Sequence, residues 1–490
     1  METFNPIGSR HQGGVTALMF IMTVVGLLAL SGMVLDVGLL YHRRQELDLM
    51  ARTVAVAAAG QLNGNSAGID KALEQGADAL RKLSYRYGTR TPAWRDDMLS
   101  FGPAADGSWR DAAGARSGPA GLTHVRADTA RLDAPVGSVT LFIMRLLSPR
   151  FASMAVATTA VAARTGIDVL PLALCAMSSQ PGAARTNPGP PVTVELVEYG
   201  FRRGVAYDLM QLNPHGIDPA NFLVDPFRAP GQAGAASAAA AGTPAASAVG
   251  PYVCTGQLAF APLLAGAALK VAQPFPLALL YRQLNSRFGQ YDSSVCSAAT
   301  AMVDRNPKSY QRDQAVPWMS AMPDEQGAQT TTTGNQRRTI ADLAAPPAGV
   351  QARMYGPLWA YARAVPFSAW SAGADEPAGG YPSFGPGDWA SLYGPSAPAA
   401  KNYPGATPYL STSGANYQLP PVGQKGQSNR RVLHVPLLAC PVTGSGSASA
   451  SMLAVAKFLM TVPATPTALY AEFGGLAPVS ALGGPVELVR

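Results

Sequence analysis

The sequence predicts an α+β fold, with an N-terminal transmembrane helix that continues into a small α/β region and then a larger β-rich domain with long loops. Three observations support this prediction. Residues 13–35 contain no charged side chain. Segments 36–62 and 66–87 then place apolar residues at helical spacing. Further on, short apolar runs alternate with turns, in a chain of 490 residues that contains 50 Gly and 42 Pro.

The first element is an expected transmembrane helix at residues 14–35, after a short tail at 1–13. The 23 uncharged residues from Gly13 to Leu35 would span roughly 34 Å as a helix, against about 30 Å for the hydrocarbon core of a bilayer. A cleavable signal has a shorter apolar core, and no small-x-small cleavage site follows at the proper distance. We therefore expect a retained membrane anchor. Its boundary residues are Gly13, Gly14, Asp36, Arg43 and Arg44.

Two features of the sequence disagree about the orientation of this anchor. Only Arg10 precedes the span, whereas Arg43, Arg44 and Arg52 follow it closely. Counted literally, the positive-inside rule places the large C-terminal part in the cytoplasm. The cysteine pattern favours the opposite side, because an even number of widely spaced cysteines is typical of disulfides in an oxidising compartment.

Asp36 ends the apolar span and has two interpretations. The carboxylate either marks the membrane interface or pairs with Arg43, Arg44 or a partner helix, since a carboxylate buried in lipid would be costly. The sequence alone leaves both interpretations open.

The four cysteines are Cys175, Cys254, Cys296 and Cys440, and none has the spacing of a zinc ligand. They form two disulfides if the compartment is oxidising, or remain four buried thiols if it is not. Residues 171–175 and 436–440 share the pattern Pro, three apolar residues, Cys. Two neighbouring strands with matching ends would bring these sulfurs together, so we favour Cys175–Cys440 and Cys254–Cys296 among the three possible pairings.

A family resemblance rests on the first 65 residues. Residues 12–15 (QGGV) lead into the apolar run, which continues as 32–41 (GMVLDVGLLY), 43–47 (RRQEL) and an Ala-rich segment at 51–60. This pattern resembles the N-terminal segment of TadG/TadE-like proteins, the pseudopilin-related components of Flp (tight adherence) pilus systems. A weaker resemblance to longer TadG-like chains covers 430–442, 453–464 and 470–475.

The resemblance implies a single-pass protein of the bacterial inner (cell) membrane. Residues 1–13 would be the cytoplasmic tail, 36–165 a TadE/TadG-like (pilin-like) extracytoplasmic region, and 166–490 a β-rich periplasmic domain. The sequence departs from the family where prepilin processing usually needs Glu, because Leu18 and Met19 stand five residues after the two glycines. This departure favours a protein that stays anchored and does not enter the fibre.

The β-rich domain should contain a low-complexity insertion at 233–250 and a loop-rich stretch at 309–428, whose aromatic residues pin the loops to the core. Segment 135–147 is apolar but short, and Arg145 interrupts it. We predict that this segment is a packed helix and not a second membrane span.

Motifs for catalysis or metal binding are missing from the sequence. The five histidines form no HExxH pattern, and neither a GxSxG elbow nor a GxxxxGK[ST] loop occurs. The net charge of +7 is scattered, which argues against nucleic-acid binding. We predict no enzyme, no cofactor, no metal and no small-molecule substrate.

The predicted function is a non-enzymatic, membrane-anchored component of Flp/Tad-type pilus assembly or a related cell-envelope machine. Its partners would be the lipid bilayer and other Tad/Flp assembly proteins or pseudopilins. The alternative is an envelope-anchored ligand-binding or adhesive surface domain, or a periplasmic enzyme with no recognisable motif.

Overall fold

The chain forms two compact units. Unit 1 contains Met1–Arg164 and Val486–Arg490, and unit 2 contains Thr165–Pro485. The structure is a computed structural model, and it describes residues 13–62, 66–85, 88–119, 121–164, 166–226, 246–258, 267–291, 295–345, 347–374, 376–377, 379–394, 397–442, 447–478, 481–484 and 486–489. The boundary near residue 165 agrees with the sequence prediction. The prediction that the second domain extends to residue 490 is wrong, because the last strand pairs inside unit 1.

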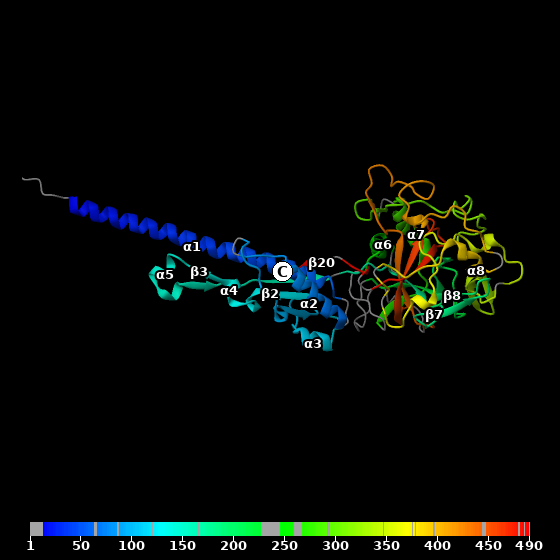
Figure 1. The fold of residues 1–490 in the computed structure, drawn as a ribbon, viewed down its shortest axis with the longest axis horizontal. Helices are drawn as coiled ribbons and strands as arrows, with labels where there is room; N and C mark the ends of the chain where they lie inside the picture. The colour runs from blue at the N-terminus through cyan, green and yellow to red at the C-terminus, as the bar shows by residue number, and fades with distance from the viewer. Residues whose placement is uncertain are drawn as a thin grey trace, which may run out of the picture. The chain divides into compact units, whose positions relative to one another are not determined.

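Unit 1 is organised around one long helix, α1 (Gly13–Ala59) (Figure 1). Large apolar side chains from Leu18 to Leu30 are exposed, whereas Leu47, Met50 and Val54 are buried. Within the described residues, α1 is the one helix long and apolar enough to cross a membrane. The first half of the helix therefore exposes apolar side chains to its surroundings, whereas the second half is amphipathic and buries one face in the core of unit 1.

The second half of α1 packs on α2 (Ser66–Arg81) and on a four-stranded antiparallel sheet. The sheet has the order β1-β2-β5-β20, with strands at Leu99–Gly102, His124–Asp128, Thr159–Arg164 and Val486–Leu488. Alternate residues such as Phe101, Val125 and Ala162 enter the same core as the α1 face. A short helix, α3 (Ala112–Ser117), contacts α2.

A hairpin leaves this core between β2 and β5. The packed helix predicted at 135–147 is wrong, because that segment holds α4 (Ala134–Gly137), β3 (Ser138–Thr140) and α5 (Met144–Leu147). Strand β3 pairs with β4 (Ser153–Ala155), with Val139 opposite Met154. The β-branched residues Val139 and Thr140 favour this extended pairing over a continuous helix.

Unit 2 is built on a closed five-stranded barrel. Its strands are β6 (Leu172–Cys175), β11 (Asn221–Val224), β12 (Ala268–Ala272), β17 (Val432–Leu438) and β18 (Ser447–Met460). The order is β18-β12-β11-β6-β17, and pairing of β17 with β18 closes the ring. One apolar cluster receives side chains from all five strands, including Ala173, Phe222, Leu269, Leu438 and Ala450.

Other elements of unit 2 surround this barrel. Strands β19 (Tyr470–Leu476) and β10 (Ala206–Asp208) extend the sheet from β18. Helices α6 (Ala246–Thr255) and α7 (Leu277–Asn285) contact each other. Further strands are β7 (Ala183–Asn187), β8 (Thr193–Glu198), β9 (Phe201–Arg202), β13 (Val303–Asp304), β14 (Thr330–Thr333), β15 (Gln336–Thr339) and β16 (Gly426–Gln427), and α8 is Trp389–Tyr393.

The loop-rich stretch at 309–428 behaves as the sequence predicts. Trp318, Trp359 and Trp389 from this stretch are all buried in the main core cluster of unit 2. Of the predicted insertion at 233–250, residues 233–245 lie outside the described residues, and 246–250 begin α6.

Candidate functional site

Asp36 lies at the end of the apolar run of α1 and is buried against another segment of unit 1. Its side chain is fully buried, and its carboxylate accepts three backbone N–H bonds of 2.8 Å each from Phe142, Ile143 and Met144. These N–H groups lie at the start of α5, where the first backbone N–H groups of a helix have no acceptor within the helix. Asp36 thus caps a segment that is more than 100 positions away in the sequence.

The alternative in which Asp36 pairs with Arg43 or Arg44 is wrong. Arg43 Nε lies 3.4 Å from Glu46 Oε2, and its guanidinium lies 5.0 Å from the ring centroid of Tyr85. Arg44 is exposed. The arginines follow Asp36 by about two helical turns, and the hairpin amides are nearer to the carboxylate.

Gly32, one turn before Asp36, lies against the same hairpin. A Cβ atom at Gly32 would overlap the side chain of Ile143, whereas Cβ atoms at Gly26 and Gly38 would meet no other atom within 4 Å. The absence of a side chain at Gly32 therefore lets Ile143 approach the helix closely. Gly13 and Gly14 are the first two residues of α1.

The cysteines of unit 2 are joined as Cys175–Cys440 and Cys254–Cys296, the pairings favoured from the sequence. Strands β6 and β17 run parallel, with Leu438 opposite Cys175, so the two Pro-x-x-x-Cys segments end side by side. The Cα atoms of Cys175 and Cys440 are 5.5 Å apart. This disulfide closes a loop of 265 positions and ties the start of unit 2 to its end.

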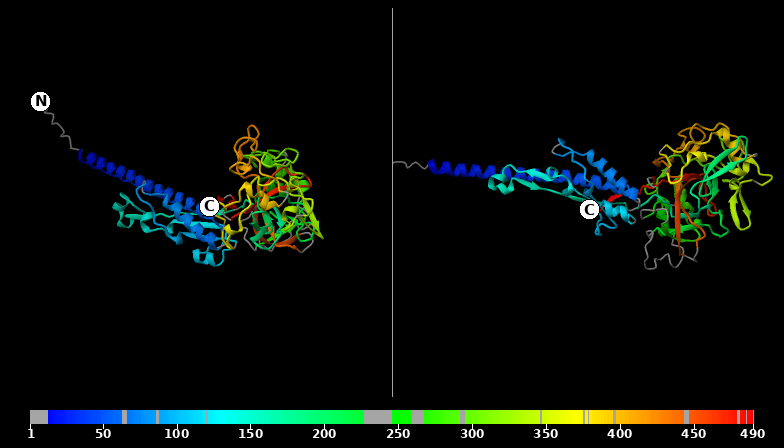
Figure 2. Two further views of the ribbon diagram at one scale, coloured as in Figure 1. Left: turned by 45° about the vertical axis from the view of Figure 1, so that its right-hand side comes forward. Right: turned by 60° about the horizontal axis from the view of Figure 1, so that its bottom comes forward.

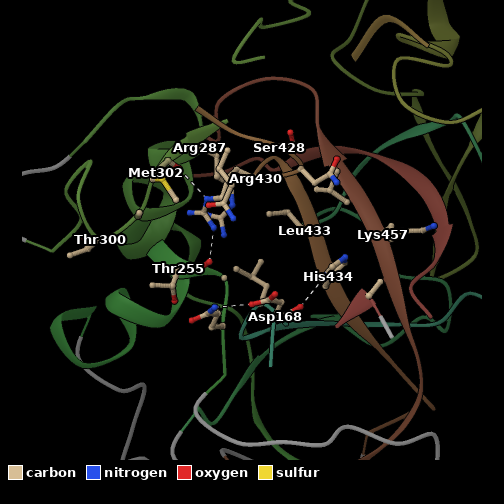
Figure 3. Close-up of a pocket in the computed structure, with 18 of the residues that line it drawn as sticks. Asp168, Thr255, Arg287, Thr300, Met302, Ser428, Arg430, Leu433, His434 and Lys457 are labelled. Atoms are coloured by element: carbon tan, nitrogen blue, oxygen red, sulfur yellow. Dashed lines mark hydrogen bonds between the residues drawn. The ribbon is translucent and has the colours of Figure 1, made fainter. Parts of the chain in front are cut away.

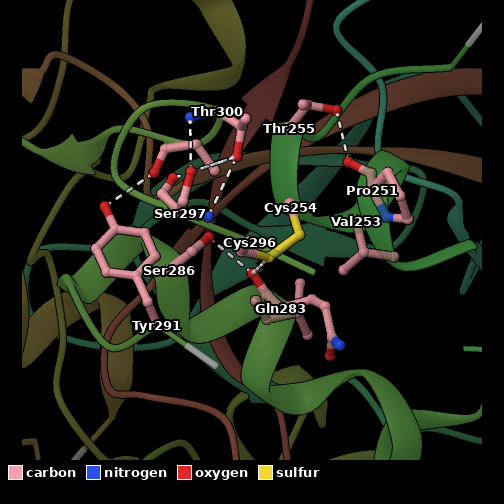
Figure 4. The surroundings of a disulfide bond; sticks show 12 residues. Pro251, Val253, Cys254, Thr255, Gln283, Ser286, Tyr291, Cys296, Ser297 and Thr300 are labelled. Carbon is pink, nitrogen blue, oxygen red and sulfur yellow. Dashed lines mark hydrogen bonds between the residues drawn. A yellow bond between two sulfur atoms is a disulfide. The ribbon is translucent and has the colours of Figure 1, made fainter. Parts of the chain in front are cut away.

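The second disulfide joins Cys254 at the end of α6 to Cys296 after α7, with Cα atoms 5.8 Å apart (Figure 4). Both cysteines are buried in a small cluster with Ala301. Tyr291 closes this cluster by donating a hydrogen bond of 2.9 Å from its hydroxyl to the Ala301 carbonyl.

A pocket of about 440 Å³ lies beside this disulfide in unit 2, lined by residues that include Arg287, Arg430 and His434 (Figure 3). Arg430 donates to the carbonyls of Cys254, Thr255 and Met302, and Arg287 donates to the carbonyl of Val253. The two arginines therefore cap the C-terminal end of α6, where a helix carries partial negative charge.

His434 and Arg287, which also line this pocket, have pKa values that burial lowers. His434 Nδ1 lies 2.7 Å from the Asp168 carbonyl, and burial lowers the pKa of His434. Burial and the nearby Arg430 lower the pKa of Arg287. Its Nε is buried and makes no hydrogen bond to any residue that the structure describes. Because this nitrogen has almost no accessible surface, a ligand in the pocket would reach it only if neighbouring side chains moved.

Unit 2 also buries carboxylates that sequence reasoning did not single out. Glu472 of β19 accepts backbone N–H bonds of 2.6–2.8 Å from Ala360, Tyr361 and Ala362. Burial raises the pKa of Glu472 to about 7, although the three N–H donors act in the opposite direction. Glu195 pairs with Arg202 at 2.6 Å in the same unit. An acidic residue within the apolar run YAEFGG was the sequence signal for Glu472.

Among the residues with described positions, no group of three or more His, Cys, Asp or Glu side chains could hold a metal ion. No family model matches this chain, and neither a curated protein nor a solved structure matches it. The geometry and the sequence pattern are therefore the basis of the functional argument.

Proposed function

We propose that the chain is a single-pass, membrane-anchored and non-enzymatic component of Flp/Tad-type pilus assembly in the bacterial inner membrane. Its bulk lies on the extracytoplasmic side, and its contacts are with other assembly proteins or pseudopilins. The pilus assignment rests on the sequence pattern at 12–60.

The observation that carries the anchoring part of this proposal is the change of character along α1. Its first half exposes apolar side chains over a length that suits a bilayer, and its second half forms the core of unit 1. An exposed apolar surface of this size on a helix is stable only when lipid or protein covers it. A continuous helix that joins the membrane to a folded unit is the expected form of such an anchor.

One observation supports the extracytoplasmic side. All four cysteines are joined in disulfides, which persist in oxidising compartments. Arg43, Arg44 and Arg52 favour the cytoplasm under the positive-inside rule, and the ion pairs of Arg43 with Glu46 and of Arg52 with Asp48 do not change that count.

The proposal is tested in the source bacterium by deleting the gene and measuring sheared surface pili and surface adherence. We expect both to be lost and to return with the intact gene. As a control, Leu419→Ser changes one exposed side chain of unit 2 and should leave pili and adherence unchanged. Normal pili in the deletion strain would refute the pilus assignment and leave the anchoring argument standing.

A second candidate is an envelope-anchored ligand-binding domain, which the pocket lined by Arg287, Arg430 and Lys457 favours. These basic side chains would attract a small oxyanion. Titration of the full chain with inorganic phosphate, followed by thermal unfolding, tests this candidate. A rise in melting temperature that Arg287→Lys abolishes would support it, and an unchanged melting temperature would rule out phosphate.

A further inference from the structure

The β3–β4 hairpin runs along α1 toward the membrane end of that helix (Figure 1, Figure 2). At its base, the Val136 carbonyl accepts a hydrogen bond of 3.3 Å from Arg43. At its tip, Ile143 donates to Asp36 and packs against Gly32. From Arg43 to Gly32 the helix rises about 16 Å, so the hairpin follows α1 for that distance.

These contacts fix the depth of the hairpin tip. A hydrocarbon core of about 30 Å corresponds to roughly 20 helical residues. The uncharged run ends at Leu35, and the first carboxylate is Asp36. The contact between Gly32 and Ile143 therefore lies at the edge of the hydrocarbon core, and Asp36 lies just outside it.

The surface of the tip is apolar on the side that unit 1 does not cover. Leu146 is 76% exposed, Phe142 58%, Met154 52% and Phe151 49%. The nearby α1 residues Leu35 and Val37 are also largely exposed. The tip and the end of the apolar run of α1 thus both expose apolar side chains.

The charges of the hairpin suit the same environment. Arg145 and Arg150 are the only charged residues between Asp133 and Arg164, and both are exposed. The Arg145 guanidinium lies 5.9 Å from the ring centroid of Phe142. Aromatic rings beside basic side chains are typical of segments that lie in the headgroup region of anionic membranes.

We propose that the hairpin tip, residues 141–152, is a second membrane contact that inserts Phe142, Leu146 and Phe151 into the headgroup region beside α1. This inference rests on the anchoring part of the proposed function. Asp36 orients the tip, because its carboxylate holds the three N–H groups that would otherwise need water or another acceptor at the membrane edge. Arg145 and Arg150 then bind lipid phosphates.

The test uses the full chain in single-copy nanodiscs that contain phosphatidylcholine and phosphatidylglycerol. Leu146→Cys introduces one free thiol, because all four native cysteines are in disulfides. This thiol is labelled with an environment-sensitive fluorophore. Quenching is measured with lipids that carry a spin label near the headgroup and with aqueous iodide.

Two matched variants complete the test. Leu30→Cys lies within the span and reports whether α1 crosses the bilayer. Ala113→Cys lies on α3, which is far from α5 in unit 1 (Figure 1), and its side chain is exposed.

We expect the label at residue 146 to be quenched by the shallow spin-labelled lipid about threefold more than the label at residue 113, and to be protected from iodide. Equal iodide quenching at residues 146 and 113, with the label at residue 30 quenched by lipid, would overturn the inference and leave the anchor intact. If the label at residue 30 also stays in water, the anchor itself is refuted.

Discussion

The Asp36 carboxylate of α1 accepts the backbone N–H of Ile143 at 2.8 Å, across 107 positions of the sequence. Neighbouring N–H groups of Phe142 and Met144 bind the same carboxylate. Through these bonds the end of the apolar run of α1 holds a hairpin of unit 1. The contact gives a structural role to the aspartate within segment 32–41 (GMVLDVGLLY).

Substitution Asp36→Ala should release the hairpin tip. A hydrogen bond to a charged group contributes about 1.5–3 kcal/mol, so the amides of residues 142–144 should exchange roughly 10- to 100-fold faster. Hydrogen–deuterium exchange of the full chain in nanodiscs measures this change. Asp36→Asn keeps one acceptor oxygen and should give an intermediate rate. Wild-type exchange in Asp36→Ala would show that the cap does not hold the tip.

Substitution Gly32→Val should displace Ile143 from α1, because a Cβ atom at Gly32 overlaps that side chain. Overpacking of this kind costs about 1–3 kcal/mol. We expect faster exchange at residues 142–144. Gly26→Val is the matched control, since it makes the same change on the same helix where no other atom lies within 4 Å. Equal exchange rates in the two variants would contradict the packing of Ile143 against Gly32.

The two disulfides should contribute unequally to the stability of unit 2. They close loops of 265 and 42 positions, which correspond to about 5.6 and 4 kcal/mol in the chain-entropy model. The pair of substitutions Cys175→Ala and Cys440→Ala should therefore lower the urea midpoint more than Cys254→Ala with Cys296→Ala. Fluorescence of the buried tryptophans follows unfolding. Non-reducing peptide mapping that found free thiols in the native protein would contradict both pairings.

The stability of unit 2 should fall as pH rises from about 5 to about 7 through the titration of Glu472. Its ordinary pKa is 4.5 and its folded pKa is about 7. Between these values the folded state keeps a proton that the unfolded chain has lost, so higher pH favours unfolding. The shift corresponds to roughly 3 kcal/mol, which is lost fully above pH 7.

Glu472→Gln should remove this part of the pH dependence, because a glutamine side chain does not titrate. Urea unfolding at pH 5, 6, 7 and 8 measures it. Glu487→Gln changes an exposed carboxyl group and should keep the wild-type profile. A wild-type profile in Glu472→Gln would mean that this carboxyl stays ionised in the folded protein.

Local patterns in the sequence were sufficient for some features of the molecule. The uncharged run at 13–35 predicts a long helix with an apolar surface, because every side chain in the run is uncharged whichever way it faces. The Cys175–Cys440 pairing was accessible because the Pro-x-x-x-Cys repeat marks equivalent ends of β6 and β17. The burial of Trp318, Trp359 and Trp389 was also predictable, because they lie in a loop-rich stretch whose aromatic residues were expected to pack on the core.

Other features depend on contacts that no local pattern encodes. Segment 135–147 is apolar enough for a helix, but pairing with β4 makes part of it a strand. The return of β20 to β5 of unit 1 joins residues more than 300 positions apart. The partner of Asp36 was missed for the same reason, since backbone N–H groups carry no sequence signature.

The central claim is that α1 anchors the chain in the membrane with its bulk outside the cytoplasm. Paired C-terminal fusions to alkaline phosphatase and to green fluorescent protein test it most directly in a bacterial host. Alkaline phosphatase is active only when its disulfides form outside the cytoplasm. We predict an active phosphatase fusion and a dark fluorescent fusion, both in the membrane fraction. An inactive phosphatase with a bright fluorescent fusion would place the bulk in the cytoplasm and contradict the claim.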